Sequence, residues 1–143
     1  MFQFVTFLFL SKKGVTPVVP MDTPEQLLEK IQALIQRNPK YKFEAYSFIL
    51  AALHYTMMGI KPPRHISGRE FCEGIRRYAV DQFGPMARTV LEYWGIRETL
   101  DFGHIVFALV EIGLMRKTEE DSLDDFKDSY PFNTAFDTRT IFD

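Results

Sequence analysis

The sequence predicts a single all-α domain, a compact bundle of five to six helices around a central apolar helix. Apolar residues recur at helical spacing in successive segments, and capping residues, glycines and prolines separate those segments. Strand-like patterning is confined to the first residues. A length of 143 residues suits one domain, and 14 Phe, 6 Tyr and 1 Trp supply large side chains for a core.

The first twenty residues stand apart from the helical pattern. Their apolar run, MFQFVTFLFL, is shorter than the roughly twenty residues that a transmembrane helix requires. Lys12 and Lys13 follow the run, whereas a secretory signal has its positive charge in front. Three interpretations remain: a β-like edge segment, an amphiphilic anchor, or translated sequence upstream of a true start at Met21, which we favour. The domain is then expected to span residues 21–137, with 138–143 as a tail.

Two helices are predicted in the first third of the domain. The first is capped by Thr23, begins with a proline and ends at Asn38-Pro39. The second covers about residues 43–58, with Gly59 as its C-cap. Their apolar positions follow the 3.6-residue period: Leu27, Leu28, Ile31, Leu34 and Ile35 in the first, and Tyr46, Ile49, Leu50, Leu53 and Met57 in the second.

A third and a fourth helix are expected after a proline-stiffened loop at residues 60–66. Ser67 and Glu70 have the spacing of a capping box, which starts the third helix. Gly84-Pro85 ends that helix and starts a short fourth one, and Gly95 is the expected C-cap of the fourth. The inward positions are Phe71, Ile75, Tyr78, Ala79 and Gln82/Phe83 in the third helix, and Val90, Leu91 and Trp94 in the fourth.

The central helix is predicted over about residues 100–115, with Thr99 as its cap. Its three polar residues share an arc of roughly 80° on a helical projection. These residues are Asp101, His104 and Glu111. Because the rest of its surface is apolar, this helix is expected to be contacted on most sides. Gly103 and Gly113 weaken it, so we expect neighbouring segments to approach closely at both.

A last helix is expected to open at Thr118, with Leu123 and Phe126 facing the core. An extended C-terminal segment follows, pinned to the body by Tyr130, Phe132 and Phe136. Nothing in the pattern of these last residues predicts a further helix.

Charge and cysteine usage bound the possible functions. Cys72 is the only cysteine, which excludes an internal disulfide and a multi-cysteine zinc site, and its helical spacing favours a small core residue. The net charge is −2, but residues 61–88 hold six basic and three acidic side chains, whereas residues 117–143 hold three basic and eight acidic ones. This segregation indicates either two solvated faces or a basic surface for an anionic partner.

Several short motifs occur together in the order seen in one bacterial family. They are Asn38-Pro39-Lys40-Tyr41, Arg64-His65-Ile66-Ser67-Gly68, Phe83-Gly84-Pro85-Met86-Ala87, Tyr93-Trp94-Gly95-Ile96, Asp101-Phe102-Gly103, Gly113-Leu114, Asp124-Asp125-Phe126 and the segment 132–136. Through them the chain resembles the Minf-type family of short bacterial proteins over about residues 24–137. The resemblance implies a bacterial cytoplasmic protein, but it brings no activity, ligand or catalytic residue with it.

The binding candidates lie in the basic loop and the helix that follows it. They are Arg64, His65, Arg69, Arg76 and Arg77. Helix starts attract anions, and arginines there can complete a phosphate or carboxylate site. The alternative is that Arg64 and His65 only fasten the loop to the body. RNA is a compatible partner because phosphate contacts need charge more than a particular geometry. Sequence-specific DNA recognition is not expected, since Arg88 is the only basic residue on the candidate recognition helix.

A metal or catalytic site is the weakest alternative. Asp101 and His104 could share an ion only with ligands from elsewhere, and Glu111 lies about 15 Å away along the helix axis. A narrow solvent-facing stripe explains the same pattern, so no cofactor is expected. The leading prediction is a non-enzymatic interaction or regulatory module in the bacterial cytoplasm, with a protein or RNA partner at residues 61–77 and no membrane. The alternatives are an RNA- or ribosome-associated binder, and a small metal protein or enzyme using Asp101 and His104.

Overall fold

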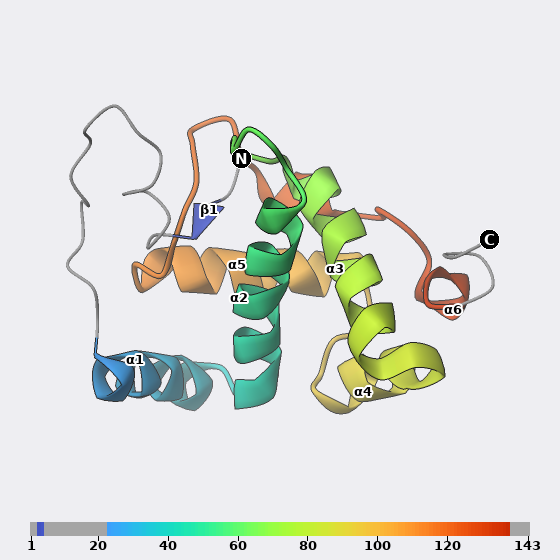
Figure 1. Ribbon diagram of the computed structural model, residues 1–143. Helices are drawn as coiled ribbons and strands as arrows, with labels where there is room; N and C mark the ends of the chain where they lie inside the picture. The colour runs from blue at the N-terminus through green and yellow to red at the C-terminus, as the bar shows by residue number, and fades with distance from the viewer. Residues whose placement is uncertain (1–2, 5–22, 138–143) are drawn as a thin grey trace.

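The computed structural model describes residues 3–4 and 23–137 and confirms the all-α class (Figure 1). In chain order the elements are β1 (Gln3–Phe4), α1 (Pro24–Arg37), α2 (Phe43–Met58), α3 (Gly68–Phe83), the 3-10 turn η2 (Gly84–Met86), α4 (Ala87–Tyr93), α5 (Thr99–Glu111), β2 (Met115–Arg116), the 3-10 turn η3 (Leu123–Phe126) and α6 (Phe132–Ala135). β1 and β2 pair antiparallel, with Gln3 opposite Arg116. The rest of the N-terminal segment, the predicted start at Met21 and the tail 138–143 lie outside the described residues.

The core lies where α2, α3 and α5 meet. α2 crosses α5, and α3 runs beside α2 (Figure 1). α5 contacts α2, α3, η3 and β2, as expected for a central helix. The largest fully buried side chains include Tyr46, Ile49 and Leu53 of α2, Phe71 and Ile75 of α3, and Phe102 and Ile105 of α5.

The helix ends in the first two thirds of the domain follow the predicted capping chemistry. Thr23 and Gln26 form a capping box at the start of α1, and Ser67 and Glu70 form another at the start of α3. Gly95 has φ +98°, and the next amide, that of Ile96, donates to the Leu91 carbonyl at 2.9 Å. This is a Schellman ending, which satisfies carbonyls that the last turn leaves open.

The central helix is shorter than predicted and begins differently. Its N-cap is Glu98, while Thr99 lies inside the helix, buried, with its hydroxyl donating to the Phe126 carbonyl at 2.6 Å. α5 ends at Glu111 instead of Met115 because Gly113 adopts φ +84° and the Leu114 amide turns back to the Leu109 carbonyl. The four residues beyond the end therefore form a turn and the start of β2.

Two predictions for the C-terminal part are wrong in detail. The helix expected from Thr118 is only the 3-10 turn η3, because the Asp121 carboxylate accepts from the Thr118 amide and caps a local turn instead. The segment expected to be extended contains the one-turn helix α6. Its aromatic anchoring is nevertheless present, since Phe132 and Phe136 are buried and their ring centroids lie 5.0 Å apart.

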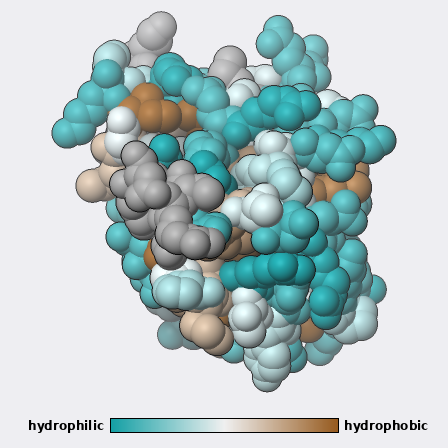
Figure 2. Space-filling model, turned by 90° about the vertical axis from the view of Figure 1, so that its right-hand side faces the viewer, coloured by the Kyte–Doolittle hydropathy of each residue, from teal (hydrophilic) through white to brown (hydrophobic). Residues whose placement is uncertain are grey.

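The outer surface is largely polar on the side that carries α3, α4 and α6. Figure 2 shows mostly hydrophilic side chains there, with hydrophobic ones in small separate areas. Among the described residues, no helix combines the length and apolar character needed to cross a membrane. Exposed apolar side chains also lie on α2, where Tyr55 is 39% and Met58 is 63% exposed.

Candidate functional site

α2 carries apolar side chains on two opposite sides, but the described elements cover only one of them. Its inner side is buried in the core. The other side, here called the outer stripe, consists of Ser47, Leu50, Ala51, His54, Tyr55 and Met58. These positions follow the i, i+3, i+4, i+7, i+8, i+11 spacing of a single helix face. A helix that is apolar all round is normally buried all round, yet Tyr55 and Met58 of the outer stripe are 39% and 63% exposed.

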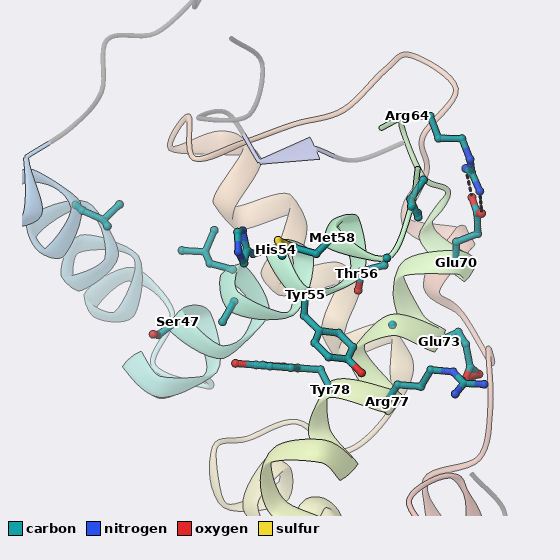
Figure 3. Close-up of a pocket in the computed structure, with 16 residues that line it drawn as sticks. Ser47, His54, Tyr55, Thr56, Met58, Arg64, Glu70, Glu73, Arg77 and Tyr78 are labelled. Carbon is teal, nitrogen blue, oxygen red and sulfur yellow. Dashed lines mark hydrogen bonds and ion pairs between the residues drawn. The ribbon is translucent and has the colours of Figure 1, made fainter. Parts of the chain in front are cut away.

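The outer stripe forms the floor of a groove between α1, α2 and α3 with a volume of about 1320 Å³ (Figure 3). The other lining residues are Leu27 of α1, Thr56 of α2, Gly59, Ile60 and Arg64 of the loop, and Glu70, Glu73, Gly74, Arg77 and Tyr78 of α3. This volume exceeds the roughly 300–1000 Å³ of a drug-sized ligand site. The groove is therefore large enough for a polypeptide segment.

A close helix crossing holds α2 and α3 in place beneath the groove. A Cβ at Gly74 would collide with the side chain of Thr56, so only glycine permits this approach. The Thr56 hydroxyl donates to the Ala52 carbonyl at 2.7 Å, which fixes the side chain against its own helix. The groove is thus lined by two helices whose separation is set by packing.

Tyr55 and Tyr78 connect the groove to the aromatic part of the core. Their ring centroids lie 5.0 Å apart, and Tyr78 lies 5.2 Å from Phe48. Phe48 in turn contacts Phe83 and Trp94, with centroid distances of 5.7 and 5.6 Å. Rings held on several sides lose little further freedom on binding, which makes them suitable anchors for a partner.

The polar rim of the groove is made of ion pairs. Arg64 and Glu70 form a two-pronged pair at 2.6 and 3.2 Å, drawn as dashed lines in Figure 3. The hydrogen bonds from Arg64 and from the Ser67 amide lower the pKa of Glu70 to about 2, so its carboxylate stays ionised. Glu73 pairs with both Arg76 and Arg77, at 3.0 and 3.5 Å.

The five predicted binding residues do not share one surface. Arg64 and Arg77 line the groove. Arg76 turns toward the C-terminal segment, where it donates to the Ala135 carbonyl and lies 5.8 Å from the Tyr130 ring centre. Arg69, two helical turns earlier, shares that side of α3. His65 is half-buried in the loop, and Arg64 donates to its carbonyl within the same loop.

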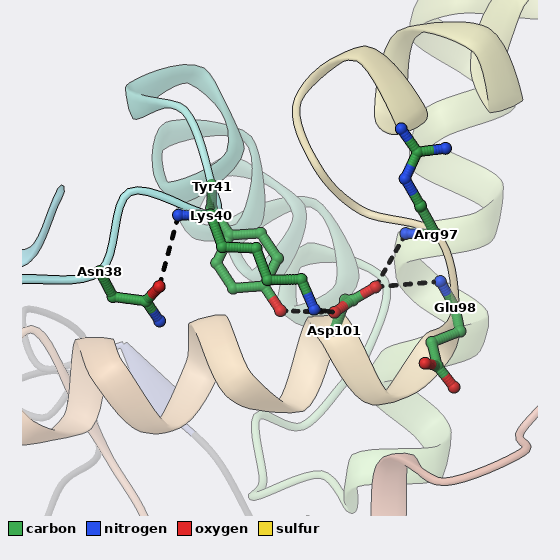
Figure 4. Close-up of polar contacts among 6 residues, drawn as sticks. All are labelled: Asn38, Lys40, Tyr41, Arg97, Glu98 and Asp101. Carbon is green, nitrogen blue, oxygen red and sulfur yellow. Dashed lines mark hydrogen bonds and ion pairs between the residues drawn. The ribbon is translucent and has the colours of Figure 1, made fainter.

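The three titratable residues of α5 differ in exposure. His104 and Glu111 face solvent as predicted, but Asp101 is buried. The residue is 2% exposed, and its carboxylate accepts four hydrogen bonds (Figure 4). The Lys40 ammonium and the Tyr41 hydroxyl reach Oδ1 at 2.9 and 2.5 Å, and the Arg97 and Glu98 amides reach Oδ2 at 2.8 and 3.2 Å. The carboxylate thereby ties the α1–α2 and α4–α5 loops to the start of α5.

The surroundings of Asp101 favour a structural role over a catalytic or metal-binding one. Burial alone would raise its pKa, but the hydrogen bonds from Tyr41, the Arg97 amide and Lys40 outweigh this effect and lower it. Burial, together with the bond to Asp101, raises the pKa of Tyr41 far above its ordinary value. His104 and Glu111 are exposed. Within the described residues, no three His, Cys, Asp or Glu side chains are placed to hold a metal ion.

Cys72 is a buried residue of α3, as its spacing predicts. Burial raises the pKa of its thiol to about 12, which leaves almost no thiolate at neutral pH. A nucleophilic role for this thiol is therefore not supported.

The outer stripe was missed by the sequence analysis, although its signal was present. The segment 43–58 contains apolar residues at two sets of helical positions, and the predicted apolar period included Leu50 of the outer stripe but not Ala51, Tyr55 or Met58. Comparison of the chain with family models, curated proteins and solved structures gave no match in any of the three. The functional interpretation therefore depends on the geometry of the groove and its rim.

Proposed function

We propose that the protein is a non-enzymatic interaction module that binds an amphipathic helix of a partner protein in the groove along α2. The outer stripe is the observation that carries this proposal. Its helical spacing matches the i, i+3, i+4, i+7 anchors by which a docked helix packs onto another. A helix lying there would complete the cover of α2, with α1 and α3 on either side.

The rim favours a protein partner over RNA. Arg64 and Arg77 face the groove, but each already contacts a glutamate. A phosphate would have to displace that glutamate, and the neighbouring carboxylates would repel it. A helix with charges of both signs beside its apolar face can instead exchange partners with these pairs.

The Minf-type resemblance and a place in the bacterial cytoplasm stay predictions alongside this proposal. They agree with a helical interaction module but supply no partner. The identity of the partner must therefore come from capture at the groove itself.

Site-specific photocrosslinking in the cells that make the protein tests the proposal. A benzophenone amino acid is placed at Ala51, on the floor of the groove, and in a second variant at Met86, an exposed apolar position outside it. We expect a protein adduct at position 51 and none of the same mass at position 86. Peptide mapping should place the crosslink in an amphipathic helical segment of the partner.

A matched pair of charge substitutions then shows whether partner binding depends on the groove or on surface charge in general. Met58→Glu places a charge in the outer stripe at a side chain that is 63% exposed, and Met86→Glu does so elsewhere at one that is 55% exposed. We expect a loss of at least tenfold in affinity for the mapped segment in the first variant only. Equal loss in both, an adduct with RNA, or an adduct with a second copy of this chain would overturn the assignment of a helical partner protein.

A further inference from the structure

A second, smaller cavity lies between the end of α1, α2 and α5. It has a volume of about 220 Å³ and shares no residue with the groove. Its polar lining consists of Arg37, Asn38, Tyr41, Tyr46, His104 and Glu111. The cavity thus brings His104 and Glu111, the two exposed polar residues of α5, together with residues from the end of α1 and the start of α2.

Tyr46 supplies the observation that points to a ligand. The residue is only 1% exposed, burial raises the pKa of its hydroxyl, and the positive charge of Arg37 acts on it in the opposite direction. No hydrogen bond of this hydroxyl is found among the described residues. Tyr46 is one of the residues that line the cavity. A buried polar group normally finds a partner, because leaving it without one costs free energy. A ligand or water in the cavity would provide that partner.

Arg37 and Glu111 carry opposite charges at this cavity but form only a long ion pair. The Arg37 Nη1 and Glu111 Oε1 atoms lie 3.4 Å apart, and both side chains are more than half exposed. Charge-assisted hydrogen bonds between such groups are usually about 2.7–2.9 Å long. Both groups therefore keep hydrogen-bonding capacity, Arg37 for an anionic group and Glu111 for a cationic one.

The nearby Lys40–Asp101 pair adds no net charge, so the surroundings of the cavity are close to neutral. A simple anion would meet Glu111, and a simple cation would meet Arg37. A ligand that carries both charges avoids each repulsion. The volume of about 220 Å³ is below the range of drug-sized ligand sites, which limits the ligand to a small one.

We propose that this cavity binds a small zwitterion of the α-amino acid class, with its carboxylate on Arg37 and Tyr46 and its ammonium on Glu111. Leu34 and Ala108 complete the lining and offer apolar contact for a short side chain. This site is independent of the groove, so either proposal can fail without the other.

Calorimetric titration of the purified full chain with L-alanine, propionate, ethylamine and N-acetyl-L-alanine tests the charge requirement. The last three each lack one of the two charges. We expect saturable binding of alanine, or of L-serine or L-valine in its place, and at least tenfold weaker binding of the three controls. Propionate or ethylamine binding as tightly as the amino acids would overturn the proposal, as would the absence of saturable binding by all three amino acids at millimolar concentrations.

Three variants test the assigned contacts. Tyr46→Phe keeps the buried ring and should weaken binding by about tenfold, the loss typical of one hydrogen bond to a charged group. Arg37→Gln should weaken it further. Arg88→Gln breaks a similar exposed pair, Arg88–Glu92 on α4, and should leave binding unchanged. Melting curves confirm that the variants are folded, and unchanged binding in both Tyr46→Phe and Arg37→Gln would overturn the assignment.

Discussion

Asp101 shows how one side chain can organise three parts of a chain. Its carboxylate accepts from Lys40 and Tyr41 before α2 and from the Arg97 and Glu98 amides before α5. Both oxygens are used, and the negative charge lies at the start of α5, where the helix dipole favours it. The desolvation that burial imposes on a carboxylate is therefore offset by several donors at once.

We expect Asp101→Asn to lower the free energy of unfolding by about 3 kcal/mol, because the amide nitrogen cannot accept a hydrogen bond and leaves buried donors without a partner. Urea denaturation followed by circular dichroism measures the change. Glu111→Gln is the control on the same helix, since its exposed pair with Arg37 should contribute less than about 1 kcal/mol. Equal effects of the two substitutions would show that Asp101 is not the anchor.

The same variant should change how stability depends on pH. Because the folded pKa of Asp101 is lowered, its contribution is complete above the unfolded value of about 3.9 and is lost as pH falls through the folded pKa. The gap between wild type and Asp101→Asn should thus be constant from pH 7 to about 5 and narrow below it. Glu70, with its pKa of about 2, titrates in both proteins and cancels in the comparison. A gap that widens toward acid pH would contradict the expected sign.

The sequence could place Asp101 on a helix face but could not reveal its neighbours. The spacing to His104 and Glu111 correctly groups them on one side of α5. Exposure, however, depends on Lys40 and Tyr41, which precede Asp101 by some sixty residues and reach it only through the fold. The local period of apolar residues carries no information on such a long-range contact. For this reason the sequence pattern predicted that Asp101 faces solvent, although its carboxylate is buried.

At the scale of elements, the two glycines predicted to mark close approaches in the central helix have different roles. Gly103 lies inside α5, where an added Cβ would come within 2.8 Å of the Leu123 side chain and 2.9 Å of Phe126. At Gly113 an added Cβ would meet no atom of the described residues within 4 Å, but this glycine adopts φ +84° and ends the helix. The sequence indicated that both glycines are unusual in a helix. Only the packing of η3 against Gly103 and the positive φ of Gly113 show that the first permits a close contact and the second ends the helix.

Gly103→Ala should therefore destabilise the protein, although alanine favours a helix by about 1 kcal/mol. Overpacking against η3 costs about 1–3 kcal/mol, and we expect a net loss of about 1 kcal/mol. Gly59→Ala is the control, because the Cβ there meets only the Thr56 carbonyl, at an ordinary 3.6 Å, and φ is −85°. Thermal unfolding should show a lower midpoint for the first variant and not for the second. A higher midpoint for Gly103→Ala would disprove the close contact.

At the scale of the whole molecule, helix caps and apolar periods predicted most of the architecture because they are local signals. The boxes at Thr23 and Ser67 and the glycine ending at Gly95 formed as expected. The groove was not predictable in this way. It arises because α1 and α3 flank α2 without covering its outer stripe, an outcome of packing between segments that no single period encodes.

The two faces of α2 should therefore contribute differently to folding. Leu53 is fully buried on the inner side, and Leu53→Ala should cost about 2–5 kcal/mol through lost burial and the cavity left behind. Met58 lies on the outer stripe and is 63% exposed, so Met58→Ser should change the free energy of unfolding by less than about 0.5 kcal/mol. Chemical denaturation of both variants measures the contrast. If Met58→Ser proved as costly as Leu53→Ala, the outer stripe would already be covered in the isolated chain, and no surface would be left for a partner helix. A small effect, combined with lost partner binding, would mean that these apolar side chains serve association and not folding.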